Sequence, residues 1–288
     1  MVDDSEEARR EARKLFEAHL DLLDASGYLP VFEKMIRSMC APFWWSSHDP
    51  NDPLAAVRQN GTICFVNTGE RRIGVTADHV YQGYLDEKGA YRDVECQIGN
   101  NTIYPETRLI DRSPETELDL ATFDIPEVFL SASGNPLRHR LAGPETHYYH
   151  HNALKWPPDP LQPGEVVAHG GFPQVLREPK QAQVDFPFQY FVTRANSVDV
   201  DRIVLEPGVD RVYWPGHAGE RINTEWHGQS GGPVYRILDA GIGGNVVDRV
   251  EVVGFIYQRY LEWVLVRPSA FIHTDGTIVR FLESTTGR

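Results

Sequence analysis

One serine of the chain has the surroundings that a nucleophile needs. Ser230 stands in the segment Gly-Gln-Ser-Gly-Gly-Pro, with Gly228 before it and a strand-like apolar run, residues 234–237, after it. Glycines on both sides of a serine permit a tight loop in which backbone N–H groups turn inward and a substrate carbonyl comes close. A nucleophile with its oxyanion hole has this pattern. An ordinary Gly-Ser turn between two strands has it too, and the segment alone does not separate the two interpretations.

A histidine upstream is a candidate general base. His79 follows an apolar strand pattern at residues 72–76, which is itself preceded by a similar pattern at residues 62–66 and a turn. The histidine comes where the strand gives way to a short helical turn, and proton transfer requires a fixed position of this kind. A histidine at a strand end can also be purely structural, with its ring satisfied by backbone groups.

A carboxylate in an apolar setting completes the set. Asp119 lies between two leucines in a strand pattern at residues 117–124. A charge in that setting needs a partner, because burying it unpaired is costly, and an imidazole N–H is a suitable one. Glu117 and Asp124 are the alternative carboxylates in the same segment, and we expect both to be solvated at the strand ends.

In chain order, these three segments resemble the trypsin-like serine peptidases of the chymotrypsin fold, in their bacterial type. The sequence TADHV resembles their TAAH motif, LDLATF their DIAL or DLAV strand, and GQSGGPVY their GDSGGP motif. The order His, Asp, Ser is also that of this fold. Residues 164–173 resemble the opening of the second barrel in bacterial Deg-type peptidases, and residues 252–257 resemble the strand after the serine loop. The resemblance runs over residues 61–257, with unmatched loops between the motifs.

The resemblance implies a catalytic triad. Ser230 would be the nucleophile, His79 the general base and later the acid, and Asp119 the group that holds the imidazole tautomer. The N–H groups of Gly228 and Ser230 would form the oxyanion hole. The substrate-binding positions that the family pattern implies are Thr224 at the base of the P1 pocket and, along the strand that pairs with an extended substrate, Tyr257, Gln258 and Arg259.

The function implied is that of a serine endopeptidase, which hydrolyses peptide bonds through an acyl-enzyme intermediate. It would act on a protein or peptide substrate, with no cofactor and no metal ion. The chain departs from the family pattern at Asp78, which adds a charge beside the base in place of a small residue. Gln229 replaces the aspartate that pairs with a newly cut amino terminus in zymogen-type members, so we do not expect activation by that ion pair. We expect no appended peptide-binding domain after Tyr257.

The fold expected from the sequence is mainly β. After residue 40, short apolar or alternating runs are separated by Gly, Pro, Asn and Asp, and no alternation with long amphipathic helices is present. We predict a double antiparallel β-barrel of chymotrypsin-like type in a peptidase domain at residues 41–288, preceded by an N-terminal helical extension at residues 1–40 with apolar residues at helical spacing. The barrels are expected at about residues 55–130 and 160–270, and the proline-rich stretches are predicted loops at residues 42–53, 157–163 and 207–219.

The net charge and the cysteine content limit the kinds of partner and the compartment that we expect. With 28 Lys and Arg against 41 Asp and Glu the net charge is −13, which repels a phosphate backbone and an anionic membrane surface. We therefore expect no nucleic acid and no membrane as partner. Three cysteines match neither a disulfide framework nor a zinc pattern, and the amino terminus lacks the order of a secretory signal, so we expect a cytoplasmic protein. The N-terminal helices are a candidate surface for a regulatory partner or self-association, or they simply pack on the body of the protein.

Three alternative readings stay open. His147, His150 and His151 have the i, i+3, i+4 spacing that could bind zinc on one helical face, although the flanking prolines favour a solvated loop. The chain could be a catalytically inactive trypsin-like fold acting as a protein-binding module, and a serine-directed covalent probe separates this reading from the enzyme. It could also be a structural or interaction protein in which the serine segment is only a turn, and a structure with Ser230 far from His79 would decide for this interpretation.

Overall fold

The fold is given by a computed structural model of the 288-residue chain. The structure describes residues 14, 36–49, 52–91, 93–99, 101–125, 129–130, 136–137, 156–174, 178–180, 183–186, 188–206, 228–239, 247–260 and 263–279. The predicted helical extension at residues 1–40 therefore lies outside the described residues, apart from residue 14 and residues 36–40. None of the described helices is long and apolar enough to cross a membrane.

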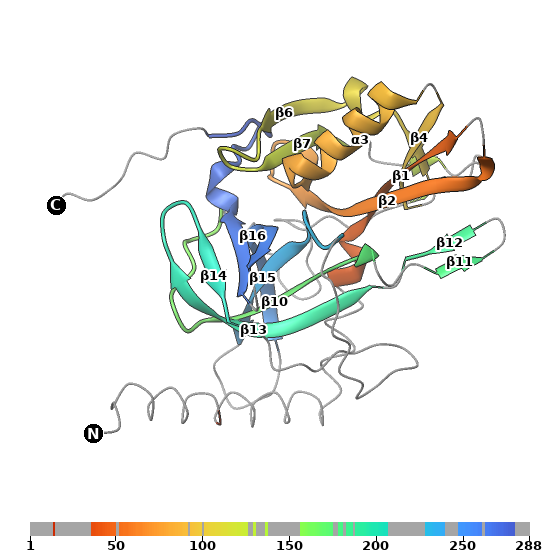
Figure 1. Ribbon diagram of the computed structural model, residues 1–288. Helices are drawn as coiled ribbons and strands as arrows, with labels where there is room; N and C mark the ends of the chain where they lie inside the picture. Colours follow the sequence, from red (N-terminus) through yellow and green to blue (C-terminus); the bar gives the residue numbers. More distant parts are fainter. Residues whose placement is uncertain are drawn as a thin grey trace.

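The first of two large β units is a seven-stranded antiparallel sheet that curls around its own core (Figure 1). Its strands follow one another across the sheet in the order β5, β4, β1, β2, β3, β7, β6. Their bounds are β1 (Cys40–Asp49), β2 (Asp52–Asn67), β3 (Arg72–Thr76), β4 (Val94–Ile98), β5 (Asn101–Ile103), β6 (Leu109–Ser113) and β7 (Leu120–Asp124). Helix α3 (Asp78–Ala90) connects β3 to β4, and a short 3-10 helix, η1 (Pro105–Thr107), connects β5 to β6.

The second unit is a closed six-stranded barrel, in the order β10, β13, β14, β17, β16, β15. Its strands are β10 (Val166–Gly171), β13 (Gln189–Val198), β14 (Ile203–Leu205), β15 (Pro233–Asp239), β16 (Val247–Tyr260) and β17 (Trp263–Pro268). Two small hairpins stand apart from both units, β8 (Phe129–Leu130) with β9 (Pro136–Leu137) and β11 (Glu178–Lys180) with β12 (Gln183–Asp185), and η3 (Ser269–Phe271) follows the barrel.

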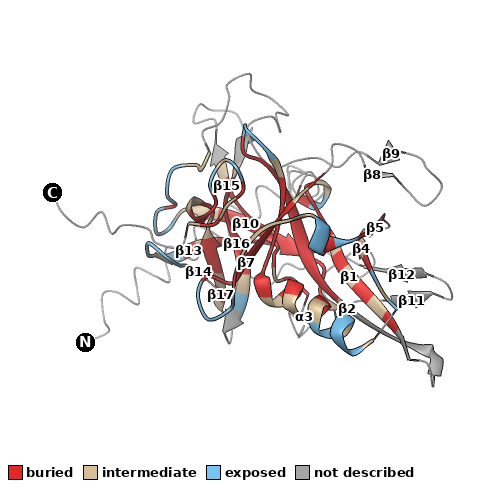
Figure 2. Ribbon diagram, turned by 90° about the horizontal axis from the view of Figure 1, so that it is seen from above, coloured by how far each residue is buried: buried red, intermediate tan, exposed pale blue. Residues whose placement is uncertain are grey.

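Three apolar clusters hold these units together. One fills the curled sheet, where Phe43, Ile63 and Phe123 pack with Tyr81 and Tyr84 of α3. A second fills the closed barrel. The third joins the two units and contains buried side chains from both, as well as Ile36 and Met39 from the segment before β1. Figure 2 shows the buried residues at the centre of the molecule. Because this shared cluster contains side chains from both units, both units hold the loops at the junction.

The mainly β prediction is confirmed, and the second predicted barrel is closed. The first predicted barrel is instead an open, curled sheet among its described strands, because β5 and β6 pair with one neighbour each. Strand β5 has only three residues, and Pro105 begins η1 shortly after it. A proline cannot donate a backbone hydrogen bond, so this stretch gives no continued edge for β6 to pair with.

Two local predictions were wrong. The proline-rich stretch at residues 42–53 is not a loop, because β1 covers much of it and alternates buried and half-buried side chains through Phe43 and Trp45. Pro42 fits into this strand through its carbonyl, which accepts the Gly99 N–H at 2.8 Å. The short helical turn predicted at His79 is a 13-residue helix, α3, whose buried face carries Val80, Tyr81 and Tyr84.

Candidate active site

His79 lies in the first turn of α3, where helix geometry leaves backbone N–H groups without partners. The residue before the helix, Ala77, has no side chain that can cap them. The carboxylate of Asp119 takes this role from the neighbouring strand segment, since its Oδ1 accepts the His79 backbone N–H at 2.9 Å. A carboxylate at a helix N-terminus is also favoured by the helix dipole. The fold thus fixes the backbone of His79 by means of Asp119.

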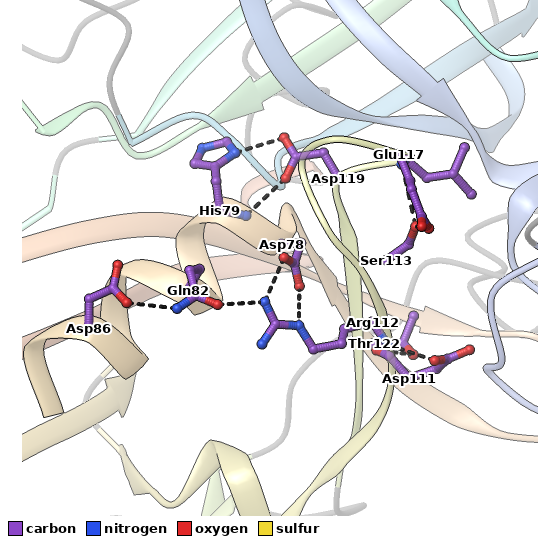
Figure 3. A network of polar contacts seen from close by, with 11 residues as sticks. Asp78, His79, Gln82, Asp86, Asp111, Arg112, Ser113, Glu117, Asp119 and Thr122 are labelled. Carbon is purple, nitrogen blue, oxygen red and sulfur yellow. Dashed lines mark hydrogen bonds and ion pairs between the residues drawn. The ribbon is translucent and has the colours of Figure 1, made fainter. Parts of the chain in front are cut away.

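The same carboxylate orients the imidazole ring. Oδ2 of Asp119 lies 2.8 Å from Nδ1 of His79 (Figure 3), with Asp119 2% and the His79 side chain 35% exposed. A carboxylate accepts but cannot donate, so Nδ1 carries the proton and Nε2 is left as an acceptor. This is the tautomer that a general base needs. The structure therefore brings two of the predicted triad residues together.

Asp119 has an unusual backbone conformation that the surrounding loop maintains. Its φ of 55° lies in the left-handed region, where aspartate is one of the few side chains found with any frequency. The Asp119 N–H donates to the Pro114 carbonyl at 3.1 Å. From β17, the buried guanidinium of Arg267 donates to the carbonyls of Leu118 at 2.7 Å and Glu117 at 3.1 Å. The closed barrel thereby holds the loop that carries Asp119.

Ser230 lies in the loop before β15, where this loop contacts the first sheet. The Thr62 N–H donates to the Ser230 carbonyl at 2.9 Å, and the Gly231 N–H donates to the Ile256 carbonyl at 2.7 Å. Gly231 has a φ of +87°, and a Cβ there would lie 2.0 Å from the Thr62 carbonyl oxygen and 2.4 Å from Oγ1 of Thr76. Only glycine permits this approach. The serine loop therefore rests against the end of β3, three residues before His79.

The side chains of Ser230 and His79 do not share a hydrogen bond within the described part of the chain. The backbone contacts bring the two segments together, and Ser230 is half-buried at their junction. In unliganded enzymes the bond between nucleophile and base is often long and tightens only in the complex with substrate. The serine loop and the strand that leads into His79 are therefore neighbours in the described structure.

The loop also offers the two predicted oxyanion donors. Gly228 has a φ of +100°, and a Cβ on it would lie 2.5 Å from the Phe172 carbonyl oxygen, so the residue must be glycine. Among the described residues no carbonyl or side chain accepts from the backbone N–H of Gly228 or of Ser230. Backbone N–H groups that make no contact within the described part of the chain, beside a half-buried serine, are suited to bind a developing oxyanion.

The described residues include only part of the predicted substrate-binding set. Thr224 lies outside the described residues. Tyr257 is half-buried with the guanidinium carbon of Arg267 4.2 Å from its ring centroid, and Gln258 is exposed. Arg259 pairs through its backbone with Val264 on β17. The pairing of β15 with β16 stops at Pro233 and Phe255, so in the described sheet residues 257–259 have a strand on one side only.

The extra charge expected beside the base is paired with an arginine. Asp78 is 2% exposed, and its two carboxylate oxygens accept from Nε and a terminal nitrogen of Arg112 at 2.7 and 2.8 Å (Figure 3). Arg112 lies on β6 and also donates to Oε1 of Gln82 at 2.8 Å. Burial raises the pKa of Asp78 above its usual value, although the hydrogen bond and charge of Arg112 oppose this. The pair ties the first turn of α3 to β6.

The electrostatic surroundings of His79 favour its protonated form. Burial of the ring acts to lower its pKa, but the hydrogen bond to Asp119 and that residue's charge act in the opposite direction. The charges of Glu115 and Asp78 add to the second effect, and the pKa of His79 is raised above its usual value. An imidazole stabilised as imidazolium in this way accepts a proton from a nucleophile more readily.

The cysteines do not offer a competing nucleophile. Cys40, Cys64 and Cys96 are all unpaired and buried. Burial raises the pKa of each thiol, that of Cys64 to about 12, so that none is a thiolate near neutral pH. The histidine segment that could bind zinc, residues 147–151, lies outside the described residues.

Reasoning from the sequence missed two residues that hold the site. Thr62 and Arg267 lie at the edges of predicted strands, and no motif marks either. A signal was present for Arg267, because a charge at the end of an apolar strand needs a partner for the same reason as Asp119. Neither a known family model nor a curated protein sequence matches the chain.

Proposed function

We propose that the protein is a serine endopeptidase with Ser230 as nucleophile, His79 as general base and Asp119 as the residue that orients it. The observation that carries this proposal is the two-point contact of Asp119 with His79, next to a serine loop that is hydrogen-bonded to the strand leading into His79. The closed barrel beside a curled β sheet is compatible with the chymotrypsin fold that the motifs resemble.

In the proposed reaction the Ser230 oxygen attacks a peptide carbonyl while Nε2 of His79 takes the hydroxyl proton. Asp119 stabilises the imidazolium that forms, and the N–H groups of Gly228 and Ser230 bind the oxyanion of the tetrahedral intermediate. Cleavage of the C–N bond gives an acyl-enzyme, and the amine leaves with the proton held by His79. Water then attacks the ester with His79 again acting as base, which releases the acid and restores Ser230.

The proposed substrate is an extended protein or peptide chain. Residues 257–259 continue past the end of the β15 pairing and lie beside the serine loop, because Ile256 bonds to both Gly231 and Gly232. An extended substrate could add its backbone to this edge, as a strand added to a sheet. The half-buried Tyr257 would then lie under the substrate, close to the Asp119 loop.

A second candidate is an inactive binding module on the same fold. The missing hydrogen bond between Ser230 and His79 in the described structure favours it, because an inactive relative would need no such contact. The two candidates differ in whether the Ser230 oxygen is activated. An unactivated serine does not attack phosphorus at a useful rate.

The test is covalent labelling with a fluorophosphonate, followed by intact mass and peptide mapping. We expect one label per chain, at Ser230, and none in Ser230→Ala. Ser197→Ala, on β13, is the matched control and should label like the wild type. A peptide-library digest on the same samples should show cleavage by the wild type and by Ser197→Ala only. Labelling at the wild-type rate in Ser230→Ala would falsify the proposal, and a wild-type chain that neither labels nor cleaves would favour the binding module.

A further inference from the structure

The hydroxyl, the backbone N–H and the carbonyl of Thr62 all form hydrogen bonds at or beside the serine loop. Its side chain is fully buried on β2, and its hydroxyl donates to the Gly228 carbonyl at 2.8 Å. The same oxygen accepts the Phe172 N–H at 3.0 Å. The Thr62 backbone N–H donates to the Ser230 carbonyl at 2.9 Å, and its carbonyl accepts from Oγ1 of Thr76 at 2.7 Å. One residue of the first sheet thus contacts the carbonyls of both predicted oxyanion donors.

These contacts fix the peptide planes around Ser230. The Gly228 carbonyl belongs to the peptide before Gln229, and the Ser230 carbonyl to the peptide after Ser230. The peptide between them carries the Ser230 N–H, and its own carbonyl, that of Gln229, accepts from Gly232 at 2.8 Å. Because a peptide unit is planar and trans, the Ser230 N–H must point away from that carbonyl. Three consecutive peptide units of the loop are therefore oriented by hydrogen bonds.

The side chain of Gln229 anchors the same loop in the closed barrel. It is 2% exposed, and its amide donates to Oε1 of Gln189 on β13 at 2.9 Å. Both side chains are neutral amides, so this hydrogen bond does not depend on the protonation of either partner. The loop is thus bound on one side by Thr62 of the first sheet and on the other by Gln189 of the barrel.

We propose that Thr62 is a positioning residue that orients the Ser230 loop so that its N–H groups face the substrate, and that the oxyanion hole is therefore formed in the uncut chain. This inference rests on the proposed function. Without the Thr62 hydroxyl, the peptide between Gly228 and Gln229 loses its link to β2, and the next peptide, which carries the Ser230 N–H, is no longer flanked on both sides by peptides bound to Thr62. The Ser230 hydroxyl and the His79–Asp119 contact are not touched by this change.

The experiment compares Thr62→Val, which removes the hydroxyl at nearly constant shape, with Thr62→Ser, which keeps it. Thr193→Val is the matched control, because Thr193 is a buried threonine on β13 whose hydroxyl donates to the Glu206 carbonyl at 2.9 Å, away from the loop. Loss of one oxyanion donor typically costs about 10²–10³ in kcat, so we expect roughly a 10- to 100-fold fall for Thr62→Val from a donor that is misdirected. KM should stay within about twofold, and Thr62→Ser and Thr193→Val should keep kcat near the wild-type value.

A peptide boronic acid gives a second readout, because it becomes tetrahedral on Ser230 and uses the oxyanion donors. Its affinity should fall in Thr62→Val by about the same factor as kcat, while that of a cleaved product peptide stays unchanged. If circular dichroism shows that Thr62→Val does not fold, Thr62→Ala replaces it, because the smaller side chain leaves room for a water molecule. Unchanged kcat in the folded variant that lacks the hydroxyl, or an equal loss in Thr193→Val, overturns the inference. A wild-type chain that does not label or cleave defeats the proposed function itself.

Discussion

The two halves of the candidate site are held by different kinds of bond. On the first sheet, His79 depends on charged side chains, with Asp119 on its ring and Asp78 paired to Arg112 next to it. At the serine loop, the contacts among the described residues are neutral and mostly between backbone groups. In the proposed mechanism, the half that carries the general base is thus built from titratable groups, and the half that carries the oxyanion donors is held by neutral ones.

This difference has a physical basis. Charged hydrogen bonds are stronger than neutral ones, but they change with pH. Neutral hydrogen bonds to a planar peptide hold a direction at any pH at which the fold is stable. We therefore expect substitutions in the histidine half to change the pH profile, whereas Thr62→Val should lower the rate without moving that profile.

The largest expected effect comes from removing the base. His79→Ala should lower kcat by about a million-fold, a loss comparable to that of Ser230→Ala, because neither group acts without the other. The double variant His79→Ala/Ser230→Ala should be no slower than either single variant. Stopped assays with an ester or peptide substrate measure all three. Independent, multiplying losses would show that the two residues do not act on the same step.

The next effect concerns the orientation of the base. Asp119→Asn keeps the shape of the side chain but offers an amide where the Nδ1 proton now lies, which favours the wrong imidazole tautomer. We expect kcat to fall by about 10⁴. The backbone N–H of His79 can still donate to the amide oxygen, so α3 should remain folded, as judged by circular dichroism. An Asp119→Asn enzyme with more than a tenth of the wild-type rate would exclude Asp119 from the triad.

Arg267 links the two halves through backbone carbonyls, and its loss should affect stability. Arg267→Met leaves the carbonyls of Leu118, Glu117 and Asp201 without their donor. Buried acceptors left unpaired cost about 1–3 kcal/mol each, partly recovered by water, so we expect about 2–4 kcal/mol less free energy of unfolding in urea. Arg202→Met is the control, because the Arg202 side chain is about half-exposed and its ion pair is long, with a terminal nitrogen 3.8 Å from Oδ2 of Asp199. This substitution should change the free energy of unfolding by less than about 0.5 kcal/mol. Equal losses in the two variants would contradict this role of Arg267.

The parts of the site that could be predicted from the sequence are those encoded within a few residues. The motif segments around His79, Asp119 and Ser230 each combine a reactive side chain with the local strand or glycine pattern that presents it. The strand pattern also predicted the class of the fold. These features are visible because strand periodicity and glycine conformation act locally.

What could not be predicted depends on contacts between distant segments. Thr62 lies 166 residues from Gly228, and Arg267 lies 149 residues from Leu118, so neither contact leaves a local pattern. The stretch that begins at Pro42 was predicted to be a loop because a proline normally argues against a strand. Only the pairing of β1 shows that the strand forms although Pro42 has no N–H to donate. The length of α3 was underestimated because its buried face is made by Tyr81 and Tyr84 against the sheet rather than by a clear apolar stripe.

The smallest expected effect is a shift of the pH profile. The proposed base acts only when His79 is neutral, so kcat/KM should rise with pH through the pKa of His79 and level off above it. Since the pKa of His79 is raised, the midpoint should lie above the usual histidine value of about 6.5. A rate that is flat between about pH 5 and 8 would exclude His79 as the base.

Asp78→Asn sharpens this prediction, because Asp78 is one of the charges that raise the pKa of His79. Removing that charge also leaves Arg112 without its ionic partner, and a nearby positive charge disfavours imidazolium. Both changes lower the midpoint. Asp86→Asn, two turns further along α3 and hydrogen-bonded to Gln82, is the control and should leave the midpoint in place. A midpoint that moves upward in Asp78→Asn would mean that the Asp78–Arg112 pair acts on His79 through its position rather than its charge.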